Sequence, residues 1–474
     1  MTAHQSKPDT MSTLTEIQLP DFGREERRPE IPIQVYQNRF EKILERMARD
    51  GIDILVVYAD REHSANLTYL TGFDPRFEEA ILLLDANGER LLLVGNECMG
   101  YLPDNELVPS VEMFQELSLL GQARDDSRPI RTIFNEFGVG NDKRIGCCGW
   151  KLFQSDLIEG GKLAIELPAY MVDCLRDLVG DASNIFNANE ILMGVEDGLR
   201  VLNEPEQIAF FEHAAGITSH GVLAVLRHIR EGVEERELER FLDSEGLPLS
   251  CHRMVSFGEK AKRGLSSASN NSAMTGDVFT TAFGVTGALN CRAGCVVGSA
   301  SDLSGELSDF FPQLVANFFD VVATWYETVR VGITGGEVFA AVESVRDDKL
   351  YHFAVNPGHY IHLDEWVNSP FTEGGKVGLR SGMALQMDII PVSNGPFCYA
   401  NMEDGVVLAD AELRQTLSNR YPAMWERIQS RREFMREALS IQLDESILPL
   451  SNMPGWLPPY ALNLDQAMVG GECG

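Results

Sequence analysis

Apolar positions in the first part of the chain switch repeatedly between helical and strand spacing. The segment "VYQNRFEKILERMARDG" has the spacing of a helix and stops at Gly51. The strand "IDILVVYA" follows, and "ILLLDANGERLLLVG" has the pattern of a hairpin with "DANGE" as its turn. The alternation continues to about residue 190 and includes "RIGCCGW" as a short buried strand. This pattern predicts an α/β domain over residues 36–192.

Residues 193–474 follow a second pattern, in which long apolar helices are separated by strand pairs. One helix starts near Pro205, breaks near Gly232 and is followed by a shorter helix. The strand pair in "GDVFTTAFGVTGALNCRAG" (276–294) comes next. A second long helix, "DFFPQLVANFFDVVATWYETVRVGITGGEVFAAVESVRDD", then repeats the order of helix, glycine and short helix. The repetition predicts a pseudo-duplicated α+β domain.

Both ends of the chain depart from these patterns. Residues 1–35 are polar, contain proline and show no periodicity, which predicts a flexible, loosely held arm. From about residue 440 the chain is rich in proline and apolar residues. We expect this carboxy-terminal extension to lie against a surface of the second domain.

Composition narrows the class of protein. With 474 residues and 44% hydrophobic content, the chain fits two soluble globular domains. A net charge of -31 argues against nucleic acid and anionic membranes as partners. We find no apolar run that fits a signal peptide or a membrane span, so we expect a cytoplasmic protein. The nine cysteines include the adjacent Cys147 and Cys148 but no paired C-x-x-C motifs, which favours reduced, mostly buried thiols.

Ionisable residues gather in three short stretches of the second domain. The stretch "NPGHYIHLDEW" holds four of them: His359, His362, Asp364 and Glu365. Asp388 interrupts the apolar strand of "GMALQMDIIP", and Glu403 precedes an apolar strand in "CYANMEDGVVL". A carboxylate in a buried strand is costly unless it is paired, bound to metal or catalytic. Taken singly, His359 also fits a hydrogen-bonded core histidine, and Asp388 also fits an acid at a strand end.

The order of these stretches resembles the pita-bread superfamily of creatinase, prolidase, aminopeptidase P and methionine aminopeptidase. The shared order is a helix with "NEPEQI", a glycine-bounded hairpin, a helix with "VGITGGEVF", then "GH", then "GM" with an acid in a strand, then "ED" before a strand. The resemblance covers residues 195 to about 415. The phrase "NLTYLTGF" is similar to the first domain of creatinase and prolidase. The resemblance implies an α/β amino-terminal domain followed by an α+β pita-bread catalytic domain.

In that superfamily, five side chains bind two metal ions: two aspartates on the hairpin, one histidine and two glutamates. The resemblance places His359 at the histidine position. It places Asp388, one methylene shorter, at the first glutamate position and Glu403 at the second. Carboxylate and imidazole ligands suit Mn, Fe, Co or Zn, and two ions about 3.5–4 Å apart can share and activate a water.

The two aspartate positions of the hairpin carry no acid in this chain. The resemblance places the first on Ala282, or on Thr280 or Thr281 if the register slips, and the second near Cys291 or Ala293. This loss argues against a dinuclear centre. It leaves no metal, or one divalent ion (Mn, Fe or Zn) on His359, Asp388 and Glu403, with His362 or Cys291 open as a further ligand.

Creatinase also lacks these aspartates and works without metal, using a histidine upstream of the hairpin. The ungapped position of that histidine is Leu265 here, so its mechanism does not carry over. The resemblance assigns substrate binding to His362 and Trp366. It further implies a homodimer in which Arg76 and Phe77 line the partner's pocket, and the alternative for these two residues is a surface loop.

Cys291 has two interpretations. Arg292 follows it directly, and a neighbouring cation lowers a thiol pKa. A packed cysteine is the simpler interpretation, because no histidine base lies beside it in sequence.

Together these features predict a hydrolase that acts on a C–N or amide-like bond of a small polar substrate without a standard dinuclear centre. His359 would serve as acid, base or ligand, and Asp388 and Glu403 would position water or hold a cationic nitrogen. One alternative is a non-hydrolytic lyase on the same fold. The other is an inactive pseudo-peptidase that binds a partner, although burying such acids serves no purpose in a pure scaffold.

Overall fold

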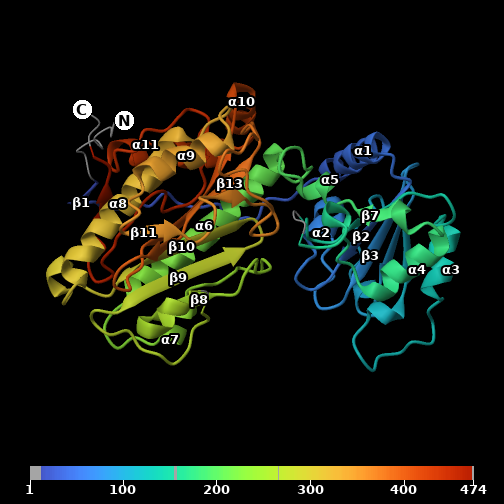
Figure 1. Ribbon diagram of the computed structural model, residues 1–474, viewed down its shortest axis with the longest axis horizontal. Helices are drawn as coiled ribbons and strands as arrows, with labels where there is room; N and C mark the ends of the chain where they lie inside the picture. Colours follow the sequence, from blue (N-terminus) through green and yellow to red (C-terminus); the bar gives the residue numbers. More distant parts are fainter. Residues whose placement is uncertain (1–11, 154–156, 265, 472–474) are drawn as a thin grey trace. The chain divides into compact units, whose positions relative to one another are not determined.

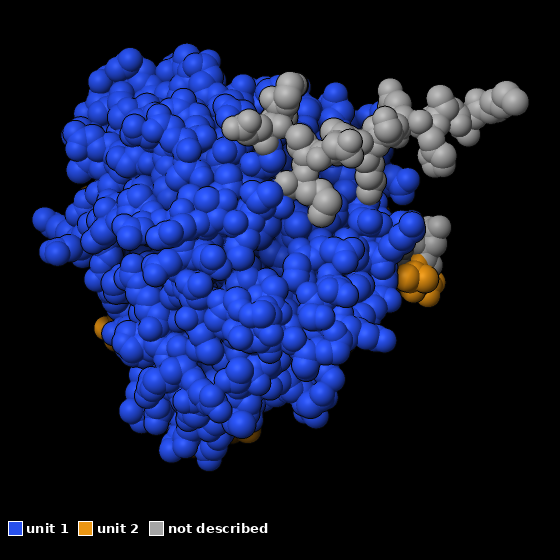
Figure 2. Space-filling view, turned by 90° about the vertical axis from the view of Figure 1, so that its left-hand side faces the viewer, with its two compact units in different colours: residues 1–30, 202–474 blue, residues 31–201 orange. Residues whose placement is uncertain are grey.

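The computed structural model describes residues 12–153, 157–264 and 266–471 (Figure 1). The chain divides into two compact units. Unit 1 comprises residues 1–30 and 202–474, and unit 2 comprises residues 31–201. Figure 2 colours the two units separately.

Unit 2 is built on a six-stranded mixed sheet with the strand order β5-β4-β3-β2-β6-β7. Its strands are β2 (Ile54–Ala59), β3 (Ala80–Asp85), β4 (Arg90–Val94), β5 (Ser110–Met113), β6 (Ile145–Cys148) and β7 (Ile185–Asn187). Its helices are α1 (Ile33–Asp50), α2 (Ala65–Thr71), α3 (Ile130–Phe137), α4 (Ala169–Val179) and α5 (Glu190–Met193).

The helix end, the hairpin and the buried strand predicted for the first domain are all present in unit 2. Helix α1 ends at Gly51, whose φ of 65° is the left-handed conformation that glycine tolerates best. Strands β3 and β4 pair antiparallel as a hairpin. Strand β6 runs parallel to β2, lies between β2 and the edge strand β7, and is fully buried. The unit is therefore an α/β domain, as expected.

Unit 1 is an α+β domain. Its strands are β1 (Thr13–Glu16), β8 (Met254–Phe257), β9 (Val278–Val285), β10 (Ala288–Cys295), β11 (Tyr351–Phe353), β12 (His359–Tyr360), β13 (Ala384–Ile389), β14 (Pro391–Ser393), β15 (Asn401–Leu408), β16 (Ile447–Pro449) and β17 (Gln466–Val469). Its helices are α6 (Pro205–His228), α7 (Glu235–Glu239), α8 (Leu307–Thr328), α9 (Gly335–Val345), α10 (Ala411–Arg420) and α11 (Pro422–Glu437).

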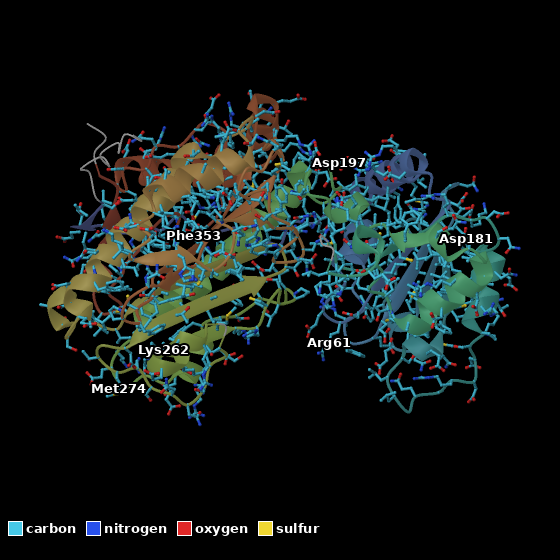
Figure 3. The ribbon with its side chains drawn as sticks, viewed as in Figure 1. Arg61, Asp181, Asp197, Lys262, Met274 and Phe353 are labelled. Carbon is cyan, nitrogen blue, oxygen red and sulfur yellow. The ribbon has the colours of Figure 1, made fainter. Side chains whose placement is uncertain are left out.

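A seven-stranded sheet forms the centre of unit 1, with the order β12-β13-β15-β10-β9-β8 and with β16 added beside β15. Helix α6 packs against β9 and β10, and α8 packs against β13. Side chains fill the space between these helices and the sheet (Figure 3). Each long helix is followed by a short one, α7 after α6 and α9 after α8, as the repeated sequence pattern predicts.

The acid-poor stretch of the sequence is the hairpin of β9 and β10. Val285 and Ala288 are paired, so the turn consists of Thr286 and Gly287. Gly287 has a φ of 96°, and a Cβ there would lie 2.9 Å from the Phe211 ring. All sixteen residues of the two strands are buried, which explains why most of this stretch is apolar.

The described part of the amino-terminal arm is more ordered than the sequence suggests. Strand β1 pairs antiparallel with β17 along its whole length, although its side chains are exposed. The Ser12 hydroxyl donates to Asp320 Oδ1 at 2.5 Å. Backbone pairing cannot be inferred from polar side chains, because it needs only free N–H and C=O groups on both edges. Residues 1–11 of the predicted arm lie outside the described residues.

The carboxy-terminal extension is integrated into unit 1 and does more than lie against its surface. Strand β16 joins the central sheet beside β15. Trp456 and Leu457 are almost completely buried. Asn452 donates to the Gly23 carbonyl and so links the two ends of the chain.

Two further expectations concern helix α6 and the cysteines. Helix α6 is long and apolar enough to cross a membrane, but 83% of its most apolar window is buried, as in the core helix of a folded domain. Eight cysteines lie among the described residues. All eight are free thiols, and only Cys251 among them is partly exposed. Reduced, mostly buried thiols were the expected outcome.

Candidate functional site

One row of residues crosses the central sheet of unit 1. Met254, Ala282, Cys291, Glu403 and Asp388 are successive cross-strand partners on β8, β9, β10, β15 and β13. Paired residues in adjacent strands point to the same face of a sheet. The row is therefore acidic at one end and apolar at the other.

His359 joins the acidic end from the neighbouring strand β12, where it is paired with Gln386. Gly358 precedes it with a φ of 115°, and a Cβ at Gly358 would lie 2.7 Å from the Gln386 carbonyl. Only glycine fits there without strain. The Trp325 indole of α8 donates to the Pro357 carbonyl at 2.8 Å and so fixes the approach to His359.

The three predicted catalytic residues meet in space. One ligand atom from each of His359, Asp388 and Glu403 lies within 4.8 Å of the other two. His359 Nε2 lies 3.5 Å from Glu403 Oε1 and 3.9 Å from Asp388 Oδ2. All three residues are buried. These three residues form the candidate site.

Two residues of the loop that follows β12 contact His359. Glu365 Oε1 lies 3.2 Å from His359 Nε2, closer than either strand carboxylate. The Trp366 ring stacks on the His359 imidazole with centroids 4.1 Å apart, and 38% of the Trp366 side chain is exposed. The predicted substrate-binding residue Trp366 thus separates His359 from solvent.

The three carboxylates differ in their protonation. Burial raises the pKa of Asp388 to about 7, and repulsion from Glu365 adds to this effect. Burial and the negative charge of Asp388 raise the pKa of Glu403 well above its ordinary value. Burial acts in the same direction on Glu365, but the His359 cation outweighs it and lowers the Glu365 pKa.

His359 carries the complementary charge. Burial alone would lower its pKa, but the carboxylates of Glu365 and Glu403 raise it well above its ordinary value. Near neutral pH the site therefore contains a His359–Glu365 ion pair. It also contains Asp388 and Glu403, which share the remaining charge and titrate as a coupled pair.

Unsatisfied oxygen acceptors surround this group. Within the described part of the chain, Asp388 Oδ1, Gln386 Oε1 and Asn401 Oδ1 are buried and accept no hydrogen bond. The amide of Gln386 donates to Glu403 Oε1 and to the Leu289 carbonyl, and that of Asn401 donates to Cys291 Sγ, so both carbonyl oxygens remain free. Unpaired buried acceptors are costly unless a ligand pairs with them.

The apolar end of the row lies where the superfamily comparison located the hairpin aspartates. Ala282 and Cys291 are direct partners and share the row with Glu403, whereas Ala293 and Thr280 lie one row away on the same face. Thr281 is adjacent to Ala282 and therefore points to the opposite face. Met254, Ala282, Leu289 and Cys291 pack together as an apolar cluster.

The donor set decides which metals the site can accommodate. His359, Asp388 and Glu403 offer one nitrogen and carboxylate oxygens, a set that fits a single divalent ion. The apolar cluster beside them offers no carboxylate for a second ion.

Cys291 is a packed thiol, and Arg292 does not activate it. Burial raises the pKa of Cys291 well above its ordinary value and outweighs the cation of Arg292. As the next residue in the strand, Arg292 points to the other face of the sheet.

We expect Cys291 to resist iodoacetamide in the folded protein at neutral pH, because only the thiolate reacts. Cys251, whose pKa burial raises to about 12, should also react slowly. Both should be modified fully in concentrated guanidinium, as peptide mass spectrometry will show. Equal labelling rates of Cys291 in the folded and unfolded protein would contradict the packed interpretation.

Three further residues were predicted to bind the substrate. His362 is completely buried, and its ring makes an edge contact with Phe211 at 5.4 Å. Arg76 and Phe77 lie in unit 2 between α2 and β3. Arg76 has a φ of 61° and pairs with Asp74, and half of the Phe77 side chain is exposed. Their role in a partner's pocket stays a prediction. Leu265 lies outside the described residues.

Three residues around the candidate site were not among those predicted from the sequence. Glu365 belongs to the densest ionisable stretch, but the sequence does not say which of its acids faces His359. Gln386 and Asn401 each precede a predicted acid by two residues. Because strand side chains alternate with a period of two, this spacing was a usable signal.

Comparisons with known proteins agree with this architecture. The model of the creatinase/prolidase N-terminal domain matches residues 39–155, and that of metallopeptidase family M24 matches residues 209–410. No curated protein sequence matches the chain.

Solved structures with a similar fold include three peptidases. A prolidase from Pyrococcus horikoshii OT3 is 16% identical, with a TM-score of 0.59 over 78% of this chain and 95% of its own. The Xaa-Pro dipeptidase of Bacillus anthracis is 18% identical, with a TM-score of 0.58 over 80% and 96%. Dipeptidase PepE of Mycobacterium ulcerans is 19% identical, with a TM-score of 0.60 over 82% and 95%.

Proposed function

Since this chain belongs to the superfamily of creatinase, prolidase and aminopeptidase P, we propose that it hydrolyses a C–N or amide-like bond in a small polar substrate, without a standard dinuclear metal centre. The proposal rests on the row of cross-strand partners that is acidic at one end and apolar at the other. Its acidic end keeps three groups that can move protons, while Ala282 and Cys291 occupy its other end.

The protonation pattern supports acid–base catalysis by the two strand carboxylates. With the pKa values of Asp388 and Glu403 both raised, one is protonated near neutral pH while the other is ionised. The ionised carboxylate takes a proton from the attacking water, and the protonated one gives a proton to the leaving nitrogen. Hydrolysis of the bond leaves the total number of protons on the pair unchanged.

His359 and Glu365 orient and balance this pair. The charged imidazole lies close to Glu365 and to the strand carboxylates. Its positive charge offsets their negative charge. Trp366, stacked on the ring, limits the access of water. If a divalent ion binds, His359, Asp388 and Glu403 would hold it, and it would act as a Lewis acid.

The unsatisfied acceptors support a substrate that donates N–H groups. Asp388, Gln386 and Asn401 each present a free oxygen on the same face, and the nearby carboxylates favour a positive charge. A protonated amine or a guanidinium satisfies both requirements, whereas a quaternary ammonium has no N–H to donate.

We also infer a cytoplasmic homodimer, with Arg76 and Phe77 of one subunit and His362 and Trp366 of the other around the substrate.

The test combines elemental analysis with a substrate screen. We expect no more than one equivalent of Mn, Fe or Zn per chain, and turnover of N-acyl or guanidino compounds in preference to betaine-like ones. His359→Ala should abolish this turnover, because it removes the residue that all three carboxylates face. His228→Ala, at an exposed histidine of α6, is the matched control and should keep it.

Chelation and readdition of metal then separate the metal-free from the mononuclear form. Two equivalents of metal per chain would contradict our interpretation of the hairpin. A compound that binds tightly at the site and is never turned over would contradict the hydrolase.

A further inference from the structure

The face of the sheet opposite the candidate site carries a buried ion pair. Arg292 Nη2 lies 2.8 Å from Asp404 Oδ2, and both side chains are 1% exposed. These residues directly follow Cys291 and Glu403 in sequence, so their side chains point away from the site. The pair is thus separated from the site only by the backbones of β10 and β15.

The guanidinium of Arg292 joins the site strands to the carboxy-terminal extension. Its Nη1 donates to the Cys291 carbonyl at 2.7 Å and more weakly to the Glu403 carbonyl at 3.4 Å. Its Nε donates to the Trp456 carbonyl at 2.8 Å, and Nη2 also bonds the Met453 carbonyl. One side chain therefore bridges the carbonyls of Cys291 and Glu403 and those of two residues of the extension.

Asn290 adds a second link of the same kind. Its amide nitrogen donates to the Glu403 carbonyl at 3.1 Å, to Asp404 Oδ1 at 2.8 Å and to the Ser451 hydroxyl at 3.1 Å. Its oxygen accepts from Thr218 of α6 at 2.7 Å. The Glu403 backbone is therefore bonded from the opposite face by two buried side chains.

We propose that Arg292 is a positioning residue, which fixes Glu403 and Cys291 by anchoring their strands to residues 451–456 of the extension. The proposal rests on the proposed function, in which Glu403 takes part in the reaction. The side-chain contacts of the Glu403 carboxylate described above, with Gln386 and His359, come from β13 and β12, so the bonds from Arg292 and Asn290 tie its backbone to β10. Residues 451–456 lie beyond the part of the chain that the M24 model matches, 209–410.

The contribution of Arg292 is geometric. Asp404 lies against it and neutralises its charge, and the Gly455 amide completes the bonding of Asp404 at 3.1 Å. Replacing the guanidinium by another cation should therefore displace the Glu403 carboxylate without changing the overall charge beside the site. Small displacements of a catalytic group reduce turnover more than binding.

The test is Arg292→Lys, which keeps the charge beside Asp404 but cannot bond all four carbonyls. We expect kcat to fall about 10- to 100-fold with little change in KM. We also expect the ring signals of His359 to move in the NMR spectrum of histidine-labelled protein at fixed pH. The His359 signals are assigned by their loss in His359→Gln. This second readout needs no substrate, so it remains informative if the proposed hydrolysis fails.

Arg431→Lys is the matched control. Arg431 is also buried, pairs with Glu212 and bonds Asn452 of the extension, but it donates to no carbonyl of β10 or β15. We expect it to lower the melting temperature as Arg292→Lys does while leaving the His359 signals in place. If Arg292→Lys does not fold, Ser451→Ala, which removes one partner of Asn290, should give a smaller displacement of the same signals.

Unmoved His359 signals in folded Arg292→Lys or Ser451→Ala would overturn the proposal. Equal movement in Arg431→Lys would overturn it as well, because the effect would then come from general loosening of the fold.

Discussion

Replacing Ala282 and Cys291 together by aspartate is expected to give a protein that binds two divalent ions and that is much less stable without them. The two positions are cross-strand partners in the row that contains Glu403 and Asp388. Four carboxylates would then face one another beside His359. This set matches the one that the superfamily resemblance implies for a dinuclear centre, except that Asp388 stands in place of a glutamate, and two ions would balance its charge.

The expected loss of stability in chelator is large. Ala282 and Cys291 are buried in an apolar cluster, and unpaired charges at such positions cost several kcal/mol. We expect the melting temperature to fall by about 10 °C with chelator present. Added Mn²⁺ should restore most of it, because an ion that binds only the folded state stabilises that state.

Differential scanning calorimetry and elemental analysis measure the two effects. The control is Ala282→Asn with Cys291→Asn, which has the same shape but no charge. It should be destabilised equally with and without metal. Metal-independent stability of the aspartate variant, or binding of a single ion, would show that these positions do not correspond to the missing ligands.

The second large effect is expected for Asp388→Asn, which should abolish turnover and yet stabilise the protein at alkaline pH. Burial raises the pKa of Asp388 to about 7, above the ordinary value of an unfolded aspartate near 3.9. Between these two values the folded state retains a proton that the unfolded state has lost. Stability therefore falls as pH rises from about 4 to about 7.

Asparagine resembles the protonated acid and does not ionise, so it removes this cost. We expect Asp388→Asn to be more stable than the wild type by about 2–4 kcal/mol at about pH 8, with little difference near pH 4. The raised pKa of His359 has the same consequence for the wild type, which loses that contribution as pH rises through the folded-state pKa. Urea unfolding in chelator at both pH values measures the difference.

Asp404→Asn provides the contrast, because Asp404 pairs with Arg292. It should destabilise the protein at about pH 8 by leaving a buried cation unpaired. The loss should be smaller near pH 4, because burial raises the pKa of Asp404. If Asp388→Asn were no more stable than the wild type at about pH 8, Asp388 would be ionised in the folded protein at little cost. It would then be available as a base but not as an acid.

Local sequence patterns predicted the elements well, because they depend on neighbouring residues. The end of α1 at Gly51 and the hairpin of β3 and β4 follow from glycine and turn chemistry. The meeting of His359, Asp388 and Glu403 could be predicted only through the motif order shared with the superfamily. The structure brings these three together, and their chemical roles stay a prediction.

Features that depend on cross-strand register or distant contacts could not be derived. Cys291 and Ala293 are two residues apart on β10 and therefore point to the same face of the sheet. Only the strand register shows that Cys291, and not Ala293, is paired with Glu403. The pairing of Glu365 with His359 depends on the path of a loop. The placement of Trp456 involves Arg292 of β10, 164 residues away in the sequence, which donates to its carbonyl.

The bond between Asn452 and Gly23, 429 residues apart in the chain, has a consequence for how the protein folds during synthesis. Unit 2 is one continuous stretch of the chain and can fold as soon as it leaves the ribosome. The central sheet of unit 1 is complete only when β16 has been synthesised and has paired with β15. Strand β1, near the start of the chain, has its partner only once β17 has been synthesised. Such non-local closure is slow. During that delay the apolar surface of β9 and β10 is exposed, so we expect new chains to depend on chaperones until the last strand is in place.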